Sequence, residues 1–89
     1  MRFSWDLSKD LLNQRDHGIT FQEATTVFGD SLAVTVSDPD HSVGEERFIT
    51  IGQSSSGRLL VVCHIEQGDT IRIISARRAT AHERKDYET

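Results

Sequence analysis

The sequence predicts a single α+β domain of 89 residues, and two changes of pattern along the chain carry this prediction. Within the first 30 residues apolar side chains recur at helical spacing, whereas from residue 32 onward they alternate with polar ones, as in strands. Short turn segments then separate one strand from the next, which favours an antiparallel meander over a doubly wound parallel sheet. We therefore expect a strand, two helices, four antiparallel strands and a C-terminal helix.

The chain begins with a predicted strand over residues 2–5 and a predicted helix over residues 7–17. Asp6 has the side chain of a helix N-cap, and Gly18 can adopt the left-handed conformation that ends a helix. The apolar face of this helix is expected to consist of three leucines, Leu7, Leu11 and Leu12.

Two capping boxes mark the starts of the other helices. Thr20 and Glu23 have the spacing in which each side chain bonds the other's backbone, and they predict a short second helix that Gly29 ends. Thr80 and Glu83 repeat this spacing and predict a polar C-terminal helix.

Four segments have the alternation of strands, and residues typical of turns separate them. The last two contain the longest apolar runs, so they are expected to lie at the centre of the sheet. The predicted strands are 32–36, 47–51, 58–66 and 70–77.

Charge is distributed unevenly along the chain. The net charge is −4, yet residues 58–85 carry six basic and three acidic side chains. Five of those six basic residues are arginines, whose planar guanidinium group can form bidentate hydrogen bonds with phosphate. A phosphate-binding surface is therefore possible on an acidic protein, and the alternative is an ordinary solvated face.

Cysteine usage and hydropathy indicate a cytoplasmic protein. The one cysteine, Cys63, stands among apolar residues and is expected to be a buried thiol in a reducing compartment. No apolar stretch reaches the roughly 20 residues that span a bilayer, and no signal peptide is recognisable. His41 has no second ligand at metal-binding spacing, so we expect neither a metal nor another cofactor.

The two central strands carry residues that suit RNA cleavage. Alternation places His64 and Glu66 on one face, as for a general base and the group that orients it. The hairpin brings Arg72 near the level of His64, and Arg77 and Arg78 end the next strand, pointing to opposite faces. These groups could activate a 2′-hydroxyl and stabilise the charge of a phosphorane. The alternative is a cross-strand ion pair of Arg72 with Glu66 or His64.

A set of motifs spread over the chain carries a resemblance to a known family. They are FSWD at 3–6, HGITFQEA at 17–24, VF at 27–28, ER at 46–47, GRLLVV at 57–62, IISARRAT at 73–80 and ERK at 83–85. With these motifs the sequence resembles the BrnT toxin family over essentially its whole length. The block at 73–80 with the following ERK is the most specific part.

The resemblance implies a RelE-like fold and a ribonuclease activity that stops translation. It also implies neutralisation by a BrnA-type antitoxin with a ribbon-helix-helix part, through which alone the toxin would reach operator DNA. The implied catalytic residues are His64, Glu66, Arg77 and Arg78, and the implied substrate-binding residues are Glu46 and Arg47. The arginine-rich charge pattern adds Arg72 and Arg84 as expected substrate-binding residues. Asp16 and Gln67 stand where this family is expected to have basic residues, which removes possible phosphate contacts.

The expected activity is a metal-independent endoribonuclease that leaves a 2′,3′-cyclic phosphate and a 5′-hydroxyl. The alternative is a non-catalytic module that serves only as the partner and co-repressor of the antitoxin. Growth arrest on expression of the chain alone distinguishes these two functions.

Overall fold

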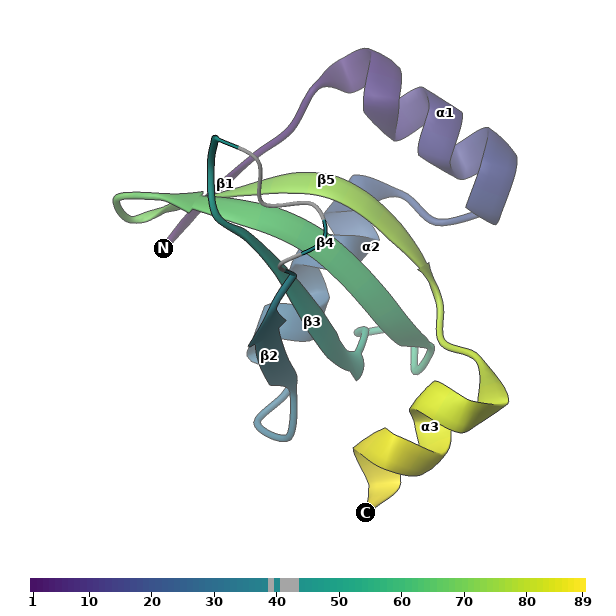
Figure 1. Ribbon diagram of the computed structural model, residues 1–89. Helices are drawn as coiled ribbons and strands as arrows, with labels where there is room; N and C mark the ends of the chain where they lie inside the picture. The colour runs from purple at the N-terminus through teal and green to yellow at the C-terminus, as the bar shows by residue number, and fades with distance from the viewer. Residues whose placement is uncertain (39, 41–43) are drawn as a thin grey trace.

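The computed structural model describes residues 1–38, 40 and 44–89, and His41 therefore lies outside it. Within these residues a five-stranded sheet, in the order β1-β5-β4-β3-β2, is covered on one face by the helical segment of residues 21–29 (Figure 1). The strands are β1 (Arg2–Ser4), β2 (Val34–Ser37), β3 (Arg47–Gln53), β4 (Leu59–Gln67) and β5 (Thr70–Arg78). The helices are α1 (Leu7–His17), α2 (Phe21–Thr25), the 3-10 helix η1 (Thr26–Gly29) and α3 (Ala81–Glu88).

The sheet is mixed. From β2 to β5, each strand pairs antiparallel with the next one along the chain. β1 pairs in parallel with the first half of β5, so the expected four antiparallel strands form part of a larger sheet. Pairing between the two ends of a chain leaves no local pattern in the sequence, and the sequence predicted β1 without its partner. The central positions of β4 and β5 are as predicted.

The core lies between one face of the sheet and the segment that contains α2 and η1. Its members from the helical side are Ile19, Phe21, Ala24 and Val27, and those from the sheet are Leu60, Val62, Ile71, Ile73 and Ala76. Full burial of a large aliphatic or aromatic side chain contributes about 1.5–3 kcal/mol. We call the opposite face of the sheet the outer face.

The predicted helix starts are confirmed, whereas the predicted second helix is divided into α2, which ends at Thr25, and η1, which ends at Gly29. The Asp6 carboxylate accepts a hydrogen bond from the backbone N–H of Lys9, and Gly18 ends α1 with a φ of 70°. Thr20 caps α2, and Thr80 and Glu83 form the complete capping box of α3. The starts of all three α-helices are thus determined by residues close to them in the sequence.

The predicted apolar face of α1 is wrong. Leu7, Leu11 and Leu12 are all exposed, and the buried residue of this helix is Asn13. The reason is that α1 packs against the outer edge of β5, beyond the short strand β1, rather than over the core. That edge presents backbone polar groups, which need a hydrogen-bonding side chain rather than a leucine.

Asn13 continues the sheet where β1 ends. Its Nδ2 donates to the carbonyl oxygen of Ala76 at 2.8 Å, and its Oδ1 accepts from the backbone N–H of Ala76 at 3.1 Å. Nδ2 also donates to the carbonyl oxygen of Ile19 at 2.9 Å. One amide side chain therefore satisfies both backbone groups of Ala76, which a longer β1 would otherwise have to cover, and also the carbonyl of Ile19.

We predict that Asn13→Ala lowers the free energy of unfolding by at least about 2 kcal/mol, because it leaves buried N–H and C=O groups without partners. Urea unfolding measures this loss. Gln14→Ala is the matched control, since its side chain is exposed on the same helix turn and its substitution should change little. Equal stability of the two variants would show that water replaces the amide at this edge.

Candidate active site

A bulge in β5 directs Arg77 away from the core. The register between β4 and β5 shifts by one residue, so Ile74 is an extra residue in β5. Ile73 is buried in the core, and strict alternation would bury Arg77 there as well. The extra residue instead brings Ala76 into the core and places Arg77 on the outer face.

A cavity of about 540 Å³ opens on the outer face. Apolar side chains of the three central strands form part of its wall, and charged side chains come from β3, β5 and the segment after β2. The lining residues are Asp38, Asp40, Arg47, Ile49, Val61, Cys63, Ile74, Ser75 and Arg77. The structure thus brings Arg47 and Arg77, two of the residues predicted from the sequence, into one cavity.

Arg77 is held in place by α3. Its two terminal nitrogens each donate to one carboxylate oxygen of Glu83 at 2.8 Å, and the same carboxylate accepts the backbone N–H of Thr80. This pairing lowers the pKa of Glu83 to about 2 and raises the pKa of Arg77. With one further bond to the carbonyl of Arg78, the described contacts use three of the five N–H donors of Arg77. The guanidinium group is thus oriented and still able to bind an anion.

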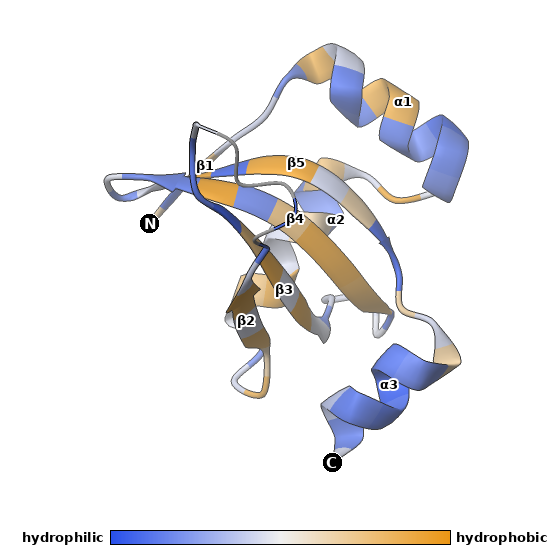
Figure 2. Ribbon diagram, in the orientation of Figure 1, coloured by the Kyte–Doolittle hydropathy of each residue, from blue (hydrophilic) through white to orange (hydrophobic). Residues whose placement is uncertain are grey.

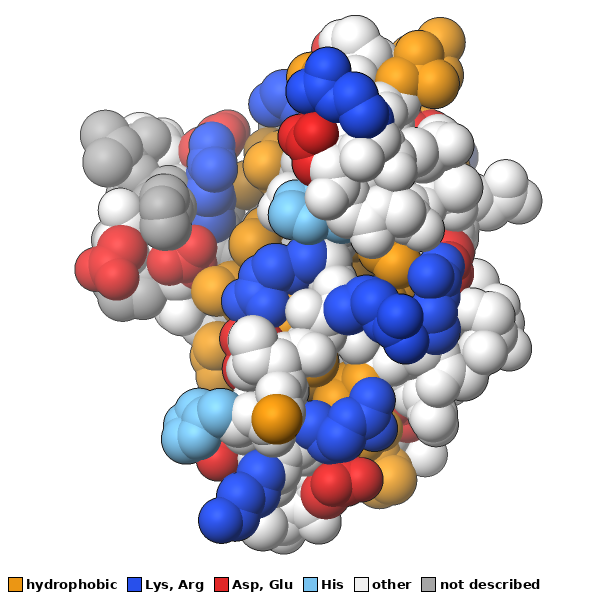
Figure 3. Space-filling model, turned by 90° about the vertical axis from the view of Figure 1, so that its right-hand side faces the viewer, with side chains coloured by type: hydrophobic (Ala, Val, Ile, Leu, Met, Phe, Trp, Pro, Cys, Tyr) orange, Lys and Arg blue, Asp and Glu red, His pale blue; other side chains and the backbone are white. Residues whose placement is uncertain are grey.

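The other predicted arginines are more dispersed. Arg72 is half-buried opposite Ile65, whereas Arg78 and Arg84 are exposed. Figure 3 shows basic side chains scattered along one side of the molecule, with acidic and hydrophobic side chains between them. The described basic residues on this side do not merge into one continuous patch.

The structure places His64 in the core rather than at the surface. Its side chain is fully buried, its ring stacks on Phe48 and meets Phe28 edge-on, and its Nε2 shares a 2.8 Å hydrogen bond with the hydroxyl of Thr50. Burial lowers the pKa of His64 to about 4, so the ring is neutral at pH 7. No hydrogen bond joins His64 to Glu66, which is exposed near the end of β4. His64 cannot reach a substrate without opening of the core.

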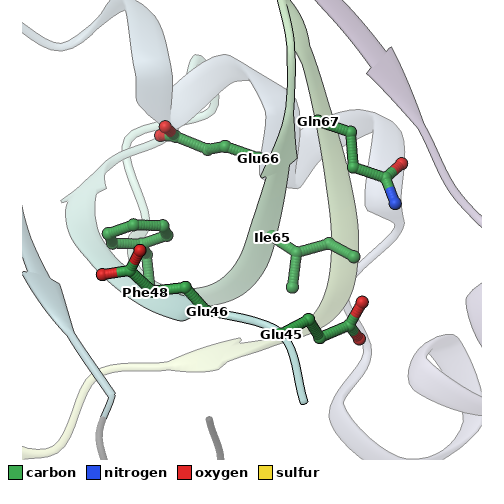
Figure 4. Close-up of a pocket in the computed structure, with 6 residues that line it drawn as sticks. All are labelled: Glu45, Glu46, Phe48, Ile65, Glu66 and Gln67. Atoms are coloured by element: carbon green, nitrogen blue, oxygen red, sulfur yellow. The ribbon is translucent and has the colours of Figure 1, made fainter.

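Glu46 and Glu66 share a second, acidic cavity of about 310 Å³ at the end of β4 (Figure 4). Glu45 joins them, and Phe48 and Ile65 complete much of the wall. Three carboxylates repel a phosphate, so the structure separates these glutamates from the arginines with which the sequence analysis grouped them.

An ion-pair cluster that the sequence analysis missed connects α2 to the turn before β4. The Glu23 carboxylate accepts hydrogen bonds from Arg58 and from the hydroxyls of Ser54 and Ser56. These contacts, chiefly the one with Arg58, lower the pKa of Glu23 to about 2. Glu23 was recognisable only as a helix-capping residue, because its partners lie more than 30 residues away.

Cys63 is half-buried in the outer-face cavity, not in the core as the sequence suggested. The reason is alternation, since its neighbours Val62 and His64 occupy the core side of β4. Among the described residues, no group of three or more His, Cys, Asp or Glu side chains is arranged to hold a metal ion. No described helix has the length and apolar character needed to cross a membrane.

These features define a small α+β protein with a cavity on the exposed side of its sheet, in which two arginines lie with two aspartates. The family model described as "Ribonuclease toxin, BrnT, of type II toxin-antitoxin system" matches residues 5–83, and the chain belongs to this family. Its fold is similar to that of the ribonuclease toxin BrnT of Brucella abortus, a crystal structure with 22% sequence identity and a TM-score of 0.65. The match covers 90% of this chain and 97% of that one. No curated protein sequence matches the chain.

We predict that acid destabilises the fold in two stages. The pKa of His64 is about 4 in the folded chain and 6.5 ordinarily, so the unfolded chain binds an extra proton between these values and stability falls as the pH drops through this window. Below the ordinary value of 4.5, protonation of Glu23 and Glu83 in the unfolded chain extends the loss towards pH 2. Urea unfolding from pH 7 down to pH 3 measures both stages.

His64→Gln is the control, because glutamine can still bond Thr50 but does not titrate. This variant should lose the stage between pH 6.5 and pH 4 and keep the more acidic one. An unchanged profile in His64→Gln would assign the first stage to another group.

Proposed function

We propose that this chain is an endoribonuclease toxin of RelE-like architecture, formed by one domain over residues 1–89, which cleaves RNA in the cytoplasm without a metal and thereby inhibits translation. The observation that supports the proposal best is the bulge in β5. It costs the sheet a regular pairing, and its effect is to place Arg77 in a cavity beside Arg47. Bulges next to active sites commonly have this role of redirecting a side chain.

In the proposed reaction a 2′-oxygen of RNA attacks the adjacent phosphorus while its proton passes to water in the open cavity. The bond from phosphorus to the 5′-oxygen then breaks, and the leaving oxygen takes a proton from water. The products are a 2′,3′-cyclic phosphate and a 5′-hydroxyl. Arg77 stabilises the phosphorane charge, and Arg47 contributes to binding the phosphate.

The remaining predicted residues take different parts in this proposal. Arg72, Arg78 and Arg84 bind phosphates on either side of the cleavage point. His64 acts as a positioning residue, because its stacking on Phe48 and its bond to Thr50 hold β3 and β4 together beneath the cavity. Glu46 and Glu66 lie in the acidic cavity, so they are better suited to a cationic partner than to RNA.

The proposed partner is a BrnA-type antitoxin, through which alone the chain would reach operator DNA. An antitoxin that binds only the folded toxin raises its melting temperature with increasing concentration. A carboxylate-bearing segment of that partner can compete with RNA for the arginines.

A second candidate function, a non-catalytic partner of the antitoxin, is favoured by one observation. Glu83 already neutralises much of the charge of Arg77, and the net charge of the chain is −4. Growth arrest by the chain alone decides in favour of the ribonuclease.

We predict that Arg77→Ala abolishes growth arrest and RNA cleavage with little loss of stability. The lost ion pair is partly exposed and contributes about 0–1 kcal/mol, whereas a cation at the phosphorane contributes several times more. Cleavage of a synthetic RNA measures activity, and urea unfolding measures stability.

Arg15→Ala is the matched control, since it removes the same charge from the exposed surface of α1 and should keep activity. Cys63 offers an independent measure of binding, because RNA with 2′-O-methyl groups should protect its thiol from alkylation in the parent chain and less so in Arg77→Ala. A folded Arg77→Ala protein that still cleaves RNA would remove Arg77 from the mechanism.

We predict that EDTA leaves RNA cleavage unchanged, because charge stabilisation by arginine replaces the metal ion in the proposed reaction. The assay uses a short unstructured RNA, so that removal of divalent ions does not alter the substrate. Loss of cleavage with EDTA, followed by recovery on addition of magnesium, would contradict the metal-independent mechanism.

A further inference from the structure

β2 forms an edge of the sheet that is unusually apolar. It pairs with β3 on one side and is the last strand in the sheet order among the described residues. Val34 and Val36 are 51% and 53% exposed, and Leu32, in the turn before the strand, is 70% exposed. Figure 2 shows hydrophobic colouring on this strand. Isolated exposed apolar residues are ordinary, but a row of them on an edge strand marks a surface that another chain can cover.

The backbone of β2 is oriented to accept another strand. The N–H of Asp38 donates to the carbonyl of Arg47 at 2.9 Å, which makes these two residues a hydrogen-bonded pair. Such pairs alternate along antiparallel strands, so the N–H and C=O groups of Val34 and Val36 point towards β3. Those of Thr35 and Ser37 therefore point outward, away from the sheet.

β2 is short, at four residues, but it lacks the other usual protections of an edge. Its sequence, VTVS, has no charged residue and no proline, and its register with β3 has no bulge. Natural edge strands normally carry at least one of these features to prevent the addition of a strand. Its unpaired backbone groups are therefore open to pairing with another strand.

The outer face continues onto β2. Val36 lies opposite Ile49, which lines the outer-face cavity, and Val34 lies opposite Ile51. Side chains directly opposite on antiparallel strands share a face of the sheet. Alternate apolar side chains of an added strand would therefore pack against Val34 and Val36 and extend this face beside the cavity.

The charged residues near β2 indicate which kind of segment would pair with this strand. The residues at and beyond the C-terminal end of β2 include Asp38, Asp40, Glu45 and Glu46, with Arg47 as the basic residue among them. A second copy of this chain would bring the same acidic surface and a net charge of −4 to the contact. A segment with lysine or arginine at the end beside Ser37 fits better.

We propose that the outer edge of β2 binds an extended segment of the antitoxin, with alternating apolar side chains and basic residues at the end that lies beside Ser37. The inference rests on the proposed function insofar as it takes the partner to be an antitoxin. It deepens that proposal by giving the antitoxin a docking site next to the cavity of Arg77, from which its chain can continue across the outer face.

The test uses a capped synthetic peptide in which two lysines precede alternating threonine and valine. Binding to the parent chain is compared with binding to Val36→Lys, which puts a charge on the edge, and to Ser37→Pro, which removes an outward N–H. We expect both variants to bind at least about tenfold more weakly. The matched control is Leu11→Lys on α1, whose side chain is 58% exposed in the parent and whose variant should bind as the parent does.

Two further peptides test the mode of binding. Replacing the two lysines by glutamates should weaken binding, and the difference should shrink at high salt because exposed charges are screened. Methylating alternate backbone nitrogens should abolish binding, since it removes the donors that pair with β2. Circular dichroism confirms that each variant is folded.

Several outcomes would overturn the proposal. The first is that the lysine peptide binds equally well to the parent and to folded Val36→Lys. The second is that only Leu11→Lys weakens binding of this peptide. The third is that the chain forms a dimer by itself, which Val36→Lys converts to a monomer. RNA cleavage by Val36→Lys should equal that of the parent, because Val36 does not line the cavity. Failure at the edge and failure of the ribonuclease proposal are therefore read from separate measurements.

Discussion

The bulge at Ile74 determines which side chains of β5 face the core, and the outer-face cavity depends on it. Continued alternation from Ile73 would bury Arg77 and expose Ala76. A buried arginine without a partner costs several kcal/mol, which a domain of this size cannot offset. With the bulge, the first half of β5 completes the core beside β1, and the second half presents polar side chains to the cavity and to α3.

The edges of β5 and β2 differ in how their backbone N–H and C=O groups are paired. On β5 the short strand β1 pairs with the first three residues, and the amide of Asn13 bonds both backbone groups of Ala76. On β2 the outward groups of Thr35 and Ser37 stand beside exposed valines. Because α1 closes the first edge with a polar side chain, its leucines are left on the surface.

Features set by neighbouring residues were predictable from the sequence, and features set by distant ones were not. Asp6, Thr20 and Thr80 bond within one helical turn, so their roles follow from spacing alone. The leucine face of α1 was wrong because its orientation depends on where β1 ends. The IRIISARR segment is compatible with either register, so the position of the bulge was open as well. The alternation correctly gave the facing of His64 but not its burial, which Phe28 and Phe48 produce.

The geometry of Arg77 is compatible with the proposed phosphate site on a chain whose net charge is −4. Interactions between exposed charges fade over about 10 Å at moderate salt, so local geometry outweighs net charge. Arg77 gives two N–H groups to Glu83 and retains others on the same rigid plane. A lysine ammonium is a single point of charge that Glu83 would occupy, whereas the guanidinium group can be anchored by α3 and still contact a second anion. The ion pair therefore orients Arg77 without consuming its capacity to bind.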